Sequence, residues 1–306
     1  MSTGMTTRAE RAGAARRPSP PDKTRKTVGM LALAAAILVC FWLVEARWSR
    51  LPEFPAQFTR YLGFMGEGVF SNPLADETVS GYWTNAFTLM LESLHMAWIG
   101  TIIGAIFSLP MGFLAARNVS PRAVVLIARA ILNAIRAIPE LIWAIMIMLP
   151  IFGLGPLSGA LALGINSIGT LGKLTSEVIE GIDPGPVEAA RASGARQLQI
   201  LRWGTLPQVM PEVVAFWLYR FEINIRAGAI LGVVAAGGIG SLLSQVLGRR
   251  LWDRAGIMLT VIIVVTIAVD LVSARIRKRI IAGPAGPAGD DAVELDDTGS
   301  HAGAFV

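Results

Sequence analysis

The 306-residue chain has few of the side chains that carry redox and metal chemistry, with one cysteine and two histidines. The lone Cys40 lies in an apolar run, which excludes an intrachain disulfide and a structural zinc site built on cysteines. His95 and His301 are too far apart in the sequence to predict a multi-histidine metal cluster. We expect His95, in an apolar helix, to form a hydrogen bond between helices rather than to bind a metal.

Charge is also scarce. Charged side chains make up 16% of the residues, against about 25% in ordinary soluble domains. Hydrophobic residues make up 53%, and the mean hydropathy is +0.56. This composition indicates an integral membrane protein. The net charge of +5 does not indicate nucleic-acid binding, because the basic residues are distributed among the segments that separate apolar runs.

The apolar runs predict an all-α, polytopic membrane protein with about six transmembrane helices. The first run, 28–44, is near the lower limit of about 17 residues for a span. A cleavable signal peptide is the competing interpretation, but no small-residue cleavage site follows, which favours an uncleaved helix. The further spans are expected at about 86–116, 123–151, 157–179, 211–235 and 256–275.

The remaining segments have distinct compositions. Residues 1–27 predict a disordered basic cytosolic tail, and residues 278–306 a disordered acidic cytosolic tail. Residues 45–84 predict an external loop. Within it, the aromatic residues are spaced by four, three and three, which predicts a helix at the bilayer surface: Phe54, Phe58, Tyr61 and Phe64.

The distribution of lysine and arginine predicts the orientation. With the N-terminus inside, sixteen basic residues fall on cytosolic segments and six on external ones. This asymmetry follows the positive-inside rule. Both termini and the loop at 181–208 are therefore expected in the cytosol.

Polar side chains recur inside the predicted spans. In 123–151 they are spaced by four, three and four, which predicts one hydrophilic helix stripe: Arg129, Asn133, Arg136 and Glu140. In 211–235, two pairs are four residues apart: Arg220 with Asn224, and Glu222 with Arg226. Two interpretations stay open, a network that clamps helices together and a positively biased path for an anion.

Two glycine-containing segments resemble nucleotide-binding motifs only superficially. The run ending in Gly237-Gly238-Ile239-Gly240 follows a membrane span rather than a strand, so a dinucleotide fingerprint is rejected. Its glycines, with Gly232, predict a helix break or close packing across a dimer axis. The segment 167–174 lacks the first glycine and the final Ser or Thr of a phosphate-binding loop. ATP is therefore expected to be hydrolysed by another chain.

The loop at 181–208 concentrates small residues. Asp183 is expected to cap a helix that a proline starts, Gly194 to end it in the left-handed conformation, and a second short helix to run from Arg196 to Trp203. Glu188 and Arg191 are spaced to pair. The spacing resembles the EAA loop of ABC-importer permeases, which the transporter's ATPase grips, at six positions: Glu188, Ala189, Ala190, Gly194, Leu206 and Pro207. The family's usual isoleucine is replaced by Gly204.

Several further segments resemble the phosphonate-importer permease (PhnE) family over about 85–277: 169–173, 207–211, 220–226, 231–232 and 237–240. The resemblance implies a type I ABC-importer permease fold with a core at 85–277 and a coupling loop at 181–208. It implies a homodimer in a bacterial inner membrane, two ATPase subunits that carry the ATP and magnesium, and an external substrate-binding protein. No cofactor is expected on this chain.

The expected substrates are phosphonate, phosphite or phosphate. A methionine-type permease shares the glycine pattern and is one alternative. A second, remote alternative is an intramembrane enzyme that uses Glu140, Glu222 or His95 as an acid or base. A third alternative is a passive channel.

Overall fold

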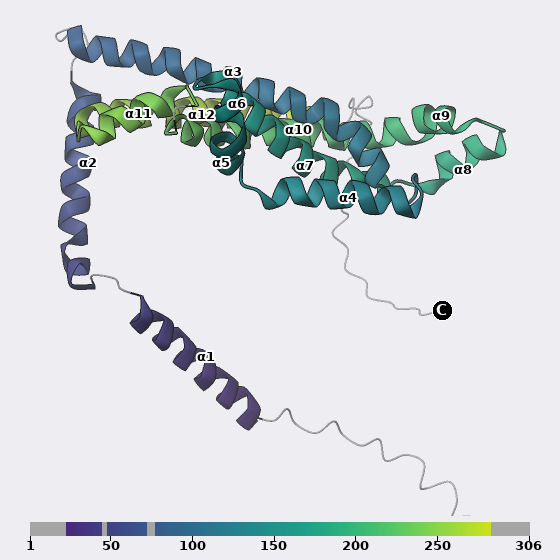
Figure 1. Ribbon diagram of the computed structural model, residues 1–306, viewed down its shortest axis with the longest axis horizontal. Coiled ribbons are helices and arrows are strands. Elements are labelled where there is room, and N and C mark those ends of the chain that lie inside the picture. Colours follow the sequence, from purple (N-terminus) through teal and green to yellow (C-terminus); the bar gives the residue numbers. More distant parts are fainter. Residues whose placement is uncertain (1–22, 45–47, 72–76, 235, 283–306) are drawn as a thin grey trace, which may run out of the picture. The chain divides into compact units, whose positions relative to one another are not determined.

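The computed structural model describes residues 23–44, 48–71, 77–234 and 236–282, and every element within these ranges is helical (Figure 1). The chain divides into two compact units between Phe58 and Thr59. The predicted tails lie outside the described residues, except that residues 23–27 and 278–282 are helical rather than disordered.

The first unit contains α1 (Lys23–Leu43) and η1 (Trp48–Glu53), a short 3-10 helix, and the start of α2 (Phe54–Phe70). Residues 26–43 of α1 are long and apolar enough to span a membrane, and none of these 18 residues is buried inside the protein. The rings of Phe41 and Trp48 stack at 4.8 Å between centroids.

The second unit is built on long helices joined by short ones. In chain order they are α3 (Glu77–Ala115), α4 (Arg122–Ala137), α5 (Glu140–Trp143), the π-helical turn η2 (Ala144–Met148), α6 (Leu149–Phe152), α7 (Pro156–Glu180), α8 (Pro184–Ala192), α9 (Gln197–Ile200), the π-helical turn η3 (Leu201–Thr205), α10 (Leu206–Gly232), α11 (Ile239–Gly248) and α12 (Trp252–Ala282).

The structure corrects the predicted span at 123–151. A break at Ile138 and Pro139 separates α4 from the segment 140–152, and the two are bent by 87°. Proline lacks the amide proton and clashes with the preceding turn, so a helix ends before it. By length and composition, three described helices qualify as spans, or four if the bent pair counts as one. The total of six stays a prediction, because α7 and α10 are long but carry many polar residues.

Small residues let α3 and α7 pack closely. A Cβ added at Gly100 would lie 2.7 Å from the Leu163 Cβ, and one at Gly112 would lie 2.5 Å from the Thr175 Cγ2. Gly104 lies equally close to Ser167. In a membrane, helices associate through such close packing rather than through the hydrophobic effect. This repeat of small residues every fourth position forms the centre of the bundle.

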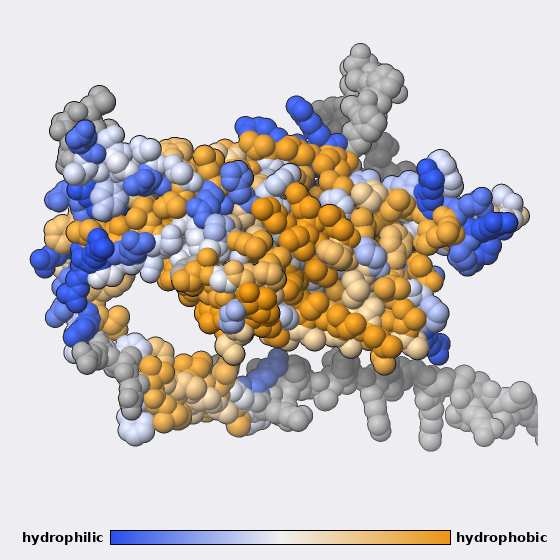
Figure 2. All heavy atoms as spheres, turned by 45° about the horizontal axis from the view of Figure 1, so that its top comes forward, coloured by the Kyte–Doolittle hydropathy of each residue, from blue (hydrophilic) through white to orange (hydrophobic). Residues whose placement is uncertain are grey.

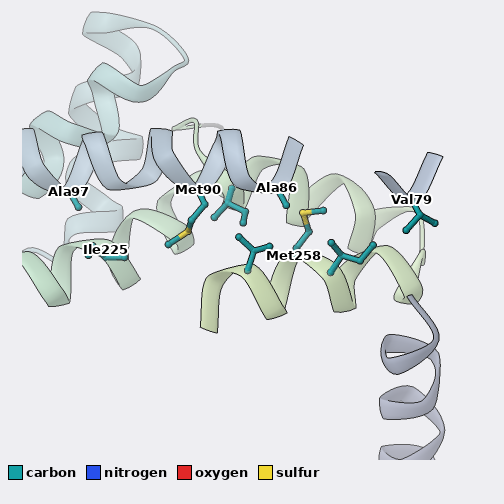
Figure 3. Packing of buried hydrophobic residues seen from close by; sticks show 9 residues of the cluster. Val79, Ala86, Met90, Ala97, Ile225 and Met258 are labelled. Carbon is teal, nitrogen blue, oxygen red and sulfur yellow. The ribbon is translucent and has the colours of Figure 1, made fainter. Parts of the chain in front are cut away.

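One large apolar cluster joins α3, α10, α11 and α12. Met90 and Ala97 of α3 face Ile225 of α10, and Val79 and Ala86 lie nearer Met258 of α12 (Figure 3). All members are at most 5% exposed. The cluster fixes α12 against the start of α3 and against the middle of α10.

The second half of α2 packs against α12 through two glycines. Gly68 lies against the backbone of Asp253, and Gly256 lies against the backbone of Met65. The ring of Tyr61 approaches that of Trp252 at 4.8 Å. The predicted helix in the aromatic segment is thus present, whereas its position at a bilayer surface stays a prediction.

The surface of the second unit separates apolar from hydrophilic regions. Figure 2 shows apolar side chains over the long helices and hydrophilic ones gathered at the tip that α8 and α9 occupy. The α8–α9 tip is therefore one of two hydrophilic ends of the second unit, with the apolar surface between them (Figure 2).

Candidate functional site

The segment between α7 and α10 forms a helical hairpin, as the sequence predicts. The Asp183 carboxylate accepts a hydrogen bond of 2.9 Å from the backbone N–H of Gly185, which caps α8. Gly194 has a φ of +77°, the left-handed conformation that ends the helix. Arg196 precedes α9, and its backbone N–H donates to Gln199 Oε1 at 2.7 Å. The second helix then continues through η3 into α10 without interruption.

Gln208, which the sequence analysis noted only as part of the segment 207–211, joins the two ends of the hairpin. Its Oε1 accepts from the backbone N–H of Asp183 at 3.1 Å, and its Nε2 donates to the Asp183 carbonyl at 3.3 Å. The same Nε2 donates to the carbonyl of Gly204 at 2.6 Å. One side chain on the first turn of α10 therefore holds the start of α8. No spacing rule could have indicated this, since the partners are 25 residues apart.

Gly204, the departure from the family pattern, is buried where η3 crosses α8. A Cβ there would lie 3.4 Å from both the Pro186 carbonyl oxygen and the Val187 Cα. This is ordinary van der Waals contact, so a methyl group fits without moving α8. The backbone of η3 therefore packs closely against the start of α8 at this glycine.

A groove of about 470 Å³ lies between the hairpin and the bundle. Glu188 and Arg191 of α8 line it, together with Glu180 at the end of α7. Within the described residues, Glu188 forms no ion pair with Arg191, so the predicted pairing is wrong. Of the six signature residues, Glu188, Ala189, Gly194 and Pro207 are exposed, and Ala190 and Leu206 are half-buried.

The base of the hairpin is tied to the neighbouring helices by Glu180. Its Oε1 accepts from Arg129 Nη2 at 2.5 Å and from the backbone N–H of Arg117 at 2.7 Å. Arg129 Nε also donates to the carbonyl of Ala115 at 2.9 Å. Burial by itself raises the pKa of the Glu180 carboxyl, but these hydrogen bonds and the two arginine charges outweigh it and lower the pKa below the ordinary value of 4.5. The ends of α3 and α7 and the middle of α4 therefore meet at one carboxylate.

A polar cluster lies in the middle of the bundle. Arg220 Nε donates to Ser167 Oγ at 2.9 Å, and its Nη2 donates to Asn166 Oδ1 at 2.6 Å. Asn224 Nδ2 donates to Thr101 Oγ1 at 2.9 Å and to Ser167 Oγ at 3.0 Å. Arg220 is only 7% exposed, and Asn224 is fully buried. Arg220 and Asn224 therefore both donate to Ser167 of α7. Sequence analysis missed all three of their partners: Thr101, Asn166 and Ser167.

The other predicted pair on α10 does not form. Glu222 lies 3.3 Å from Arg277, and Arg226 lies 2.6 Å from Asp270, so both residues pair with α12 rather than with each other. Side chains four apart on a helix are free to turn toward a second helix when it offers a full charge. This face of α10 is thus a clamp to α12.

The predicted four-residue stripe is interrupted. Arg129, Asn133 and Arg136 lie on α4, whereas Glu140 begins α5 beyond the 87° bend. Asn133 and Arg136 are exposed, and Glu140 is half-buried. The prediction of one continuous helix stripe is therefore wrong at Glu140, because Pro139 ends the helix.

Polar side chains compensate the backbone groups that the break frees. Asn166 Nδ2 donates to the carbonyl of Ile138 at 3.3 Å, and Trp143 Nε1 donates to that of Ile135 at 3.3 Å. Such groups are costly when left unpaired in a membrane. Asn166 therefore links Arg220 of α10 to the break between α4 and α5.

The glycine run forms the turn between α10 and α11, which confirms the helix break that was one of its two predicted roles. Gly237 and Gly238 have φ of +84° and +70°. The close packing occurs within the chain, because Gly240 lies against the Ala229 carbonyl oxygen and the Gly232 backbone. Sequence analysis missed the residues of α3 that receive the turn. The Gly238 N–H donates to Glu92 Oε1 at 3.3 Å, and the Ile239 N–H donates to Ser93 Oγ at 3.0 Å.

His95 is exposed on α3 and, within the described part of the chain, has no hydrogen bond to another helix. Its predicted role between helices is therefore wrong for the single chain.

Solved structures share this arrangement of helices. A methionine ABC transporter, MetNI, in an inward-facing conformation matches with a TM-score of 0.56 and 22% identity, covering 62% of this chain and 93% of that one. An amino acid ABC transporter matches with a TM-score of 0.55 and 21% identity, covering 68% and 98%. The fold is therefore that of a type I ABC-importer permease.

The family follows from the sequence match. The chain belongs to the family described as binding-protein-dependent transport system inner membrane component, which matches residues 108–282. It is a multi-pass inner-membrane component of a transport system and not an enzyme, so the hypothesis that Glu140, Glu222 or His95 acts as an acid or base is set aside.

Curated relatives are similar over most of the core. The phosphate-import permease protein PhnE of Mycolicibacterium smegmatis is 40% identical over 219 residues, which are 71% of this chain but 41% of that protein. The phosphite transport system permease protein PtxC of Stutzerimonas stutzeri is 43% identical over 190 residues, 62% of this chain and 69% of that one. The putative cryptic phosphonate transport system permease protein PhnE2 of Escherichia coli is 44% identical over 121 residues, 40% and 99%.

Proposed function

We propose that this chain is the permease subunit of an ATP-driven importer for a phosphorus oxyanion, namely phosphonate, phosphite or phosphate. Two copies form the membrane pathway, two separate ATPase subunits supply the energy, and an external binding protein delivers the substrate. The core at 85–277 carries the transport function, and both termini and the hairpin face the cytosol, where ATP is.

The α8–α9 hairpin carries this proposal. It presents small signature residues at one hydrophilic end of the bundle (Figure 2) and has two exposed apolar side chains, Leu198 (79%) and Trp203 (70%). Large exposed apolar residues beside a groove are typical of a protein-binding surface. The ATPase would grip this surface, and Gln208 would pass its displacement to α10.

The substrate class rests on charge and on the relatives. Two proteins named for phosphate and phosphite transport are 40% and 43% identical to this chain, whereas a probable D-methionine permease is 29% identical. Arg220 makes its hydrogen bonds to neutral groups, and Glu140 attracts it without forming an ion pair. No bound carboxylate therefore neutralises the charge of Arg220, and an oxyanion would meet this charge at Nη1, since Nε and Nη2 already donate to Ser167 and Asn166.

The geometry separates the four intramembrane arginines into two groups. Arg129 and Arg226 are neutralised by Glu180 and Asp270, which supports a scaffold role. Arg220 and Arg136 are not so neutralised, and we assign them to the pathway. With the second copy in place, the exposed Asn133 and Arg136 of α4 would face either the path or the partner.

The assembled transporter in proteoliposomes tests the proposal. We expect ATP hydrolysis to rise when the binding protein is loaded with phosphonate, phosphite or phosphate, and to stay basal with methionine. Uptake without ATP or without the ATPase would instead establish a passive channel. Stimulation by methionine alone would establish the methionine-type alternative.

A further inference from the structure

A second pocket, of about 520 Å³, lies where α3 turns into α4. It is separate from the groove beneath the hairpin, and no step of the proposed transport uses it. Its lining combines basic and apolar side chains: Arg117, Ser120, Arg122, Val125, Leu126 and Arg129.

The pocket has an excess of positive charge. Arg117 and Arg122 are exposed, and neither side chain forms an ion pair within the described residues. Arg129 donates from Nη2 to the Glu180 carboxylate and from Nε to the Ala115 carbonyl. Glu180 lines the neighbouring groove rather than this pocket. Of the three guanidinium groups in the lining, that of Arg129 is paired with Glu180, whereas those of Arg117 and Arg122 form no ion pair within the described residues.

The depth of the pocket in a membrane follows from the candidate spans. The span in α3 ends at Ala115, and the bent span begins at Arg122. The pocket therefore lies at the turn that joins two candidate spans, and such a turn is expected at a membrane surface, because irregular backbone is not exposed to lipid tails. One turn further along α4, Leu126 is 74% exposed and Ile127 is 61% exposed. Arg122 and Leu126 lie on one face, four residues apart, so a basic surface continues directly into an apolar one.

We propose that this pocket binds the phosphate headgroup of an anionic phospholipid. The forked guanidinium groups of Arg117 and Arg122 match phosphate oxygens, and the acyl chains lie along Val125 and Leu126. A soluble anion would gain nothing from these apolar residues, which favours a lipid. Basic pockets between transmembrane helices at the cytoplasmic boundary suit such headgroups. This assignment does not depend on which substrate is transported.

The site has a consequence for the hairpin. Arg129 is shared between the pocket and Glu180, the carboxylate at the base of α8. An anion bound in the pocket competes for the Arg129 charge, so the lipid composition would alter how firmly the hairpin is held.

Lipid binding to the full-length chain, measured by native mass spectrometry in detergent, tests the proposal. Phosphatidylglycerol is compared with phosphatidylcholine of the same acyl chains. We expect a preference of about tenfold or more for phosphatidylglycerol, since each arginine near the surface contributes about 1 kcal/mol. The double variant Arg117→Gln/Arg122→Gln should abolish the preference. Arg249→Gln/Arg250→Gln, which removes the same charge at the α11–α12 turn, should retain it.

Two further measurements distinguish a lipid headgroup from free phosphate and test whether a variant is still folded. Leu126→Gln leaves the charges in place and should weaken binding of long-chain phosphatidylglycerol, with unchanged thermal unfolding. Millimolar inorganic phosphate should not displace the lipid. The lipid site is overturned by the absence of a preference in the unmodified chain, by equal losses in both double variants, or by displacement with inorganic phosphate.

Discussion

The guanidinium of Arg220 donates a 2.6 Å hydrogen bond to the side-chain oxygen of Asn166, and the amide nitrogen of the same Asn166 donates to the Ile138 carbonyl. One asparagine thus satisfies a buried cation on α10 and a carbonyl freed by the break before α5. This relationship connects the two polar segments that the sequence shows separately.

Asn166→Leu should therefore destabilise the bundle. The substitution leaves a buried donor and a buried acceptor unpaired, and the loss of a hydrogen bond to a charged group costs about 1.5–3 kcal/mol. We expect a lower midpoint of thermal unfolding in detergent and reduced uptake. Asn133→Leu, on the exposed face of α4, is the control and should unfold like the unmodified chain. Equal midpoints of thermal unfolding for the two variants would show that the hydrogen bonds of Asn166 do not stabilise the bundle.

Glu188→Lys should abolish uptake while membrane insertion stays intact. The exposed carboxylate is on the hairpin surface that we assign to the ATPase, and reversing its charge opposes docking without touching the core. The measurement combines uptake with co-purification of the ATPase. Glu67→Lys makes the same charge change on an exposed residue of α2 and should leave both unchanged. Normal uptake by Glu188→Lys would contradict the coupling role.

Gly240→Ala should disrupt the turn between α10 and α11. The new methyl group would overlap the Ala229 carbonyl oxygen, and overpacking of this kind costs about 1–3 kcal/mol. We expect a lower folded yield by size-exclusion chromatography. Gly248→Ala is the matched control, since nothing lies within 4 Å of its added Cβ. Indistinguishable yields would mean that the turn relaxes freely.

The Glu180 carboxyl should make stability depend on acid pH. Its pKa is lowered in the folded chain, so its contribution is complete above the ordinary value of 4.5 and is lost as the pH falls through the lowered pKa. Thermal unfolding measured from about pH 7 downward should show this loss. In Glu180→Gln the pH dependence should be smaller, and stability at neutral pH should be lower. An unchanged pH profile in the variant would show that other carboxylates dominate.

Much of the hairpin was predictable because its signals are local. Asp183, Gly194 and the prolines of α8 act within one or two turns of the backbone, so residue type and spacing suffice. The break at Pro139 was missed because proline is tolerated inside some membrane helices, including α3, which continues through Pro110. At Pro139 the chain bends where two donors satisfy the freed carbonyls, Asn166 of α7 and Trp143 of α5. These contacts depend on how the helices pack, so the sequence alone could not distinguish a tolerated proline from a bend.

The sequence by itself determined the membrane class and the hairpin, because composition and short-range spacing encode both, and its signature residues carry the resemblance to importer permeases. The tertiary structure decided which polar groups meet. Glu222 and Arg226 pair with residues of α12 rather than with each other. Gln208 and Glu180 hold the hairpin to the neighbouring helices. Such pairings join residues tens of positions apart, and a side chain in a low-dielectric bundle takes whichever partner the helix packing brings within reach.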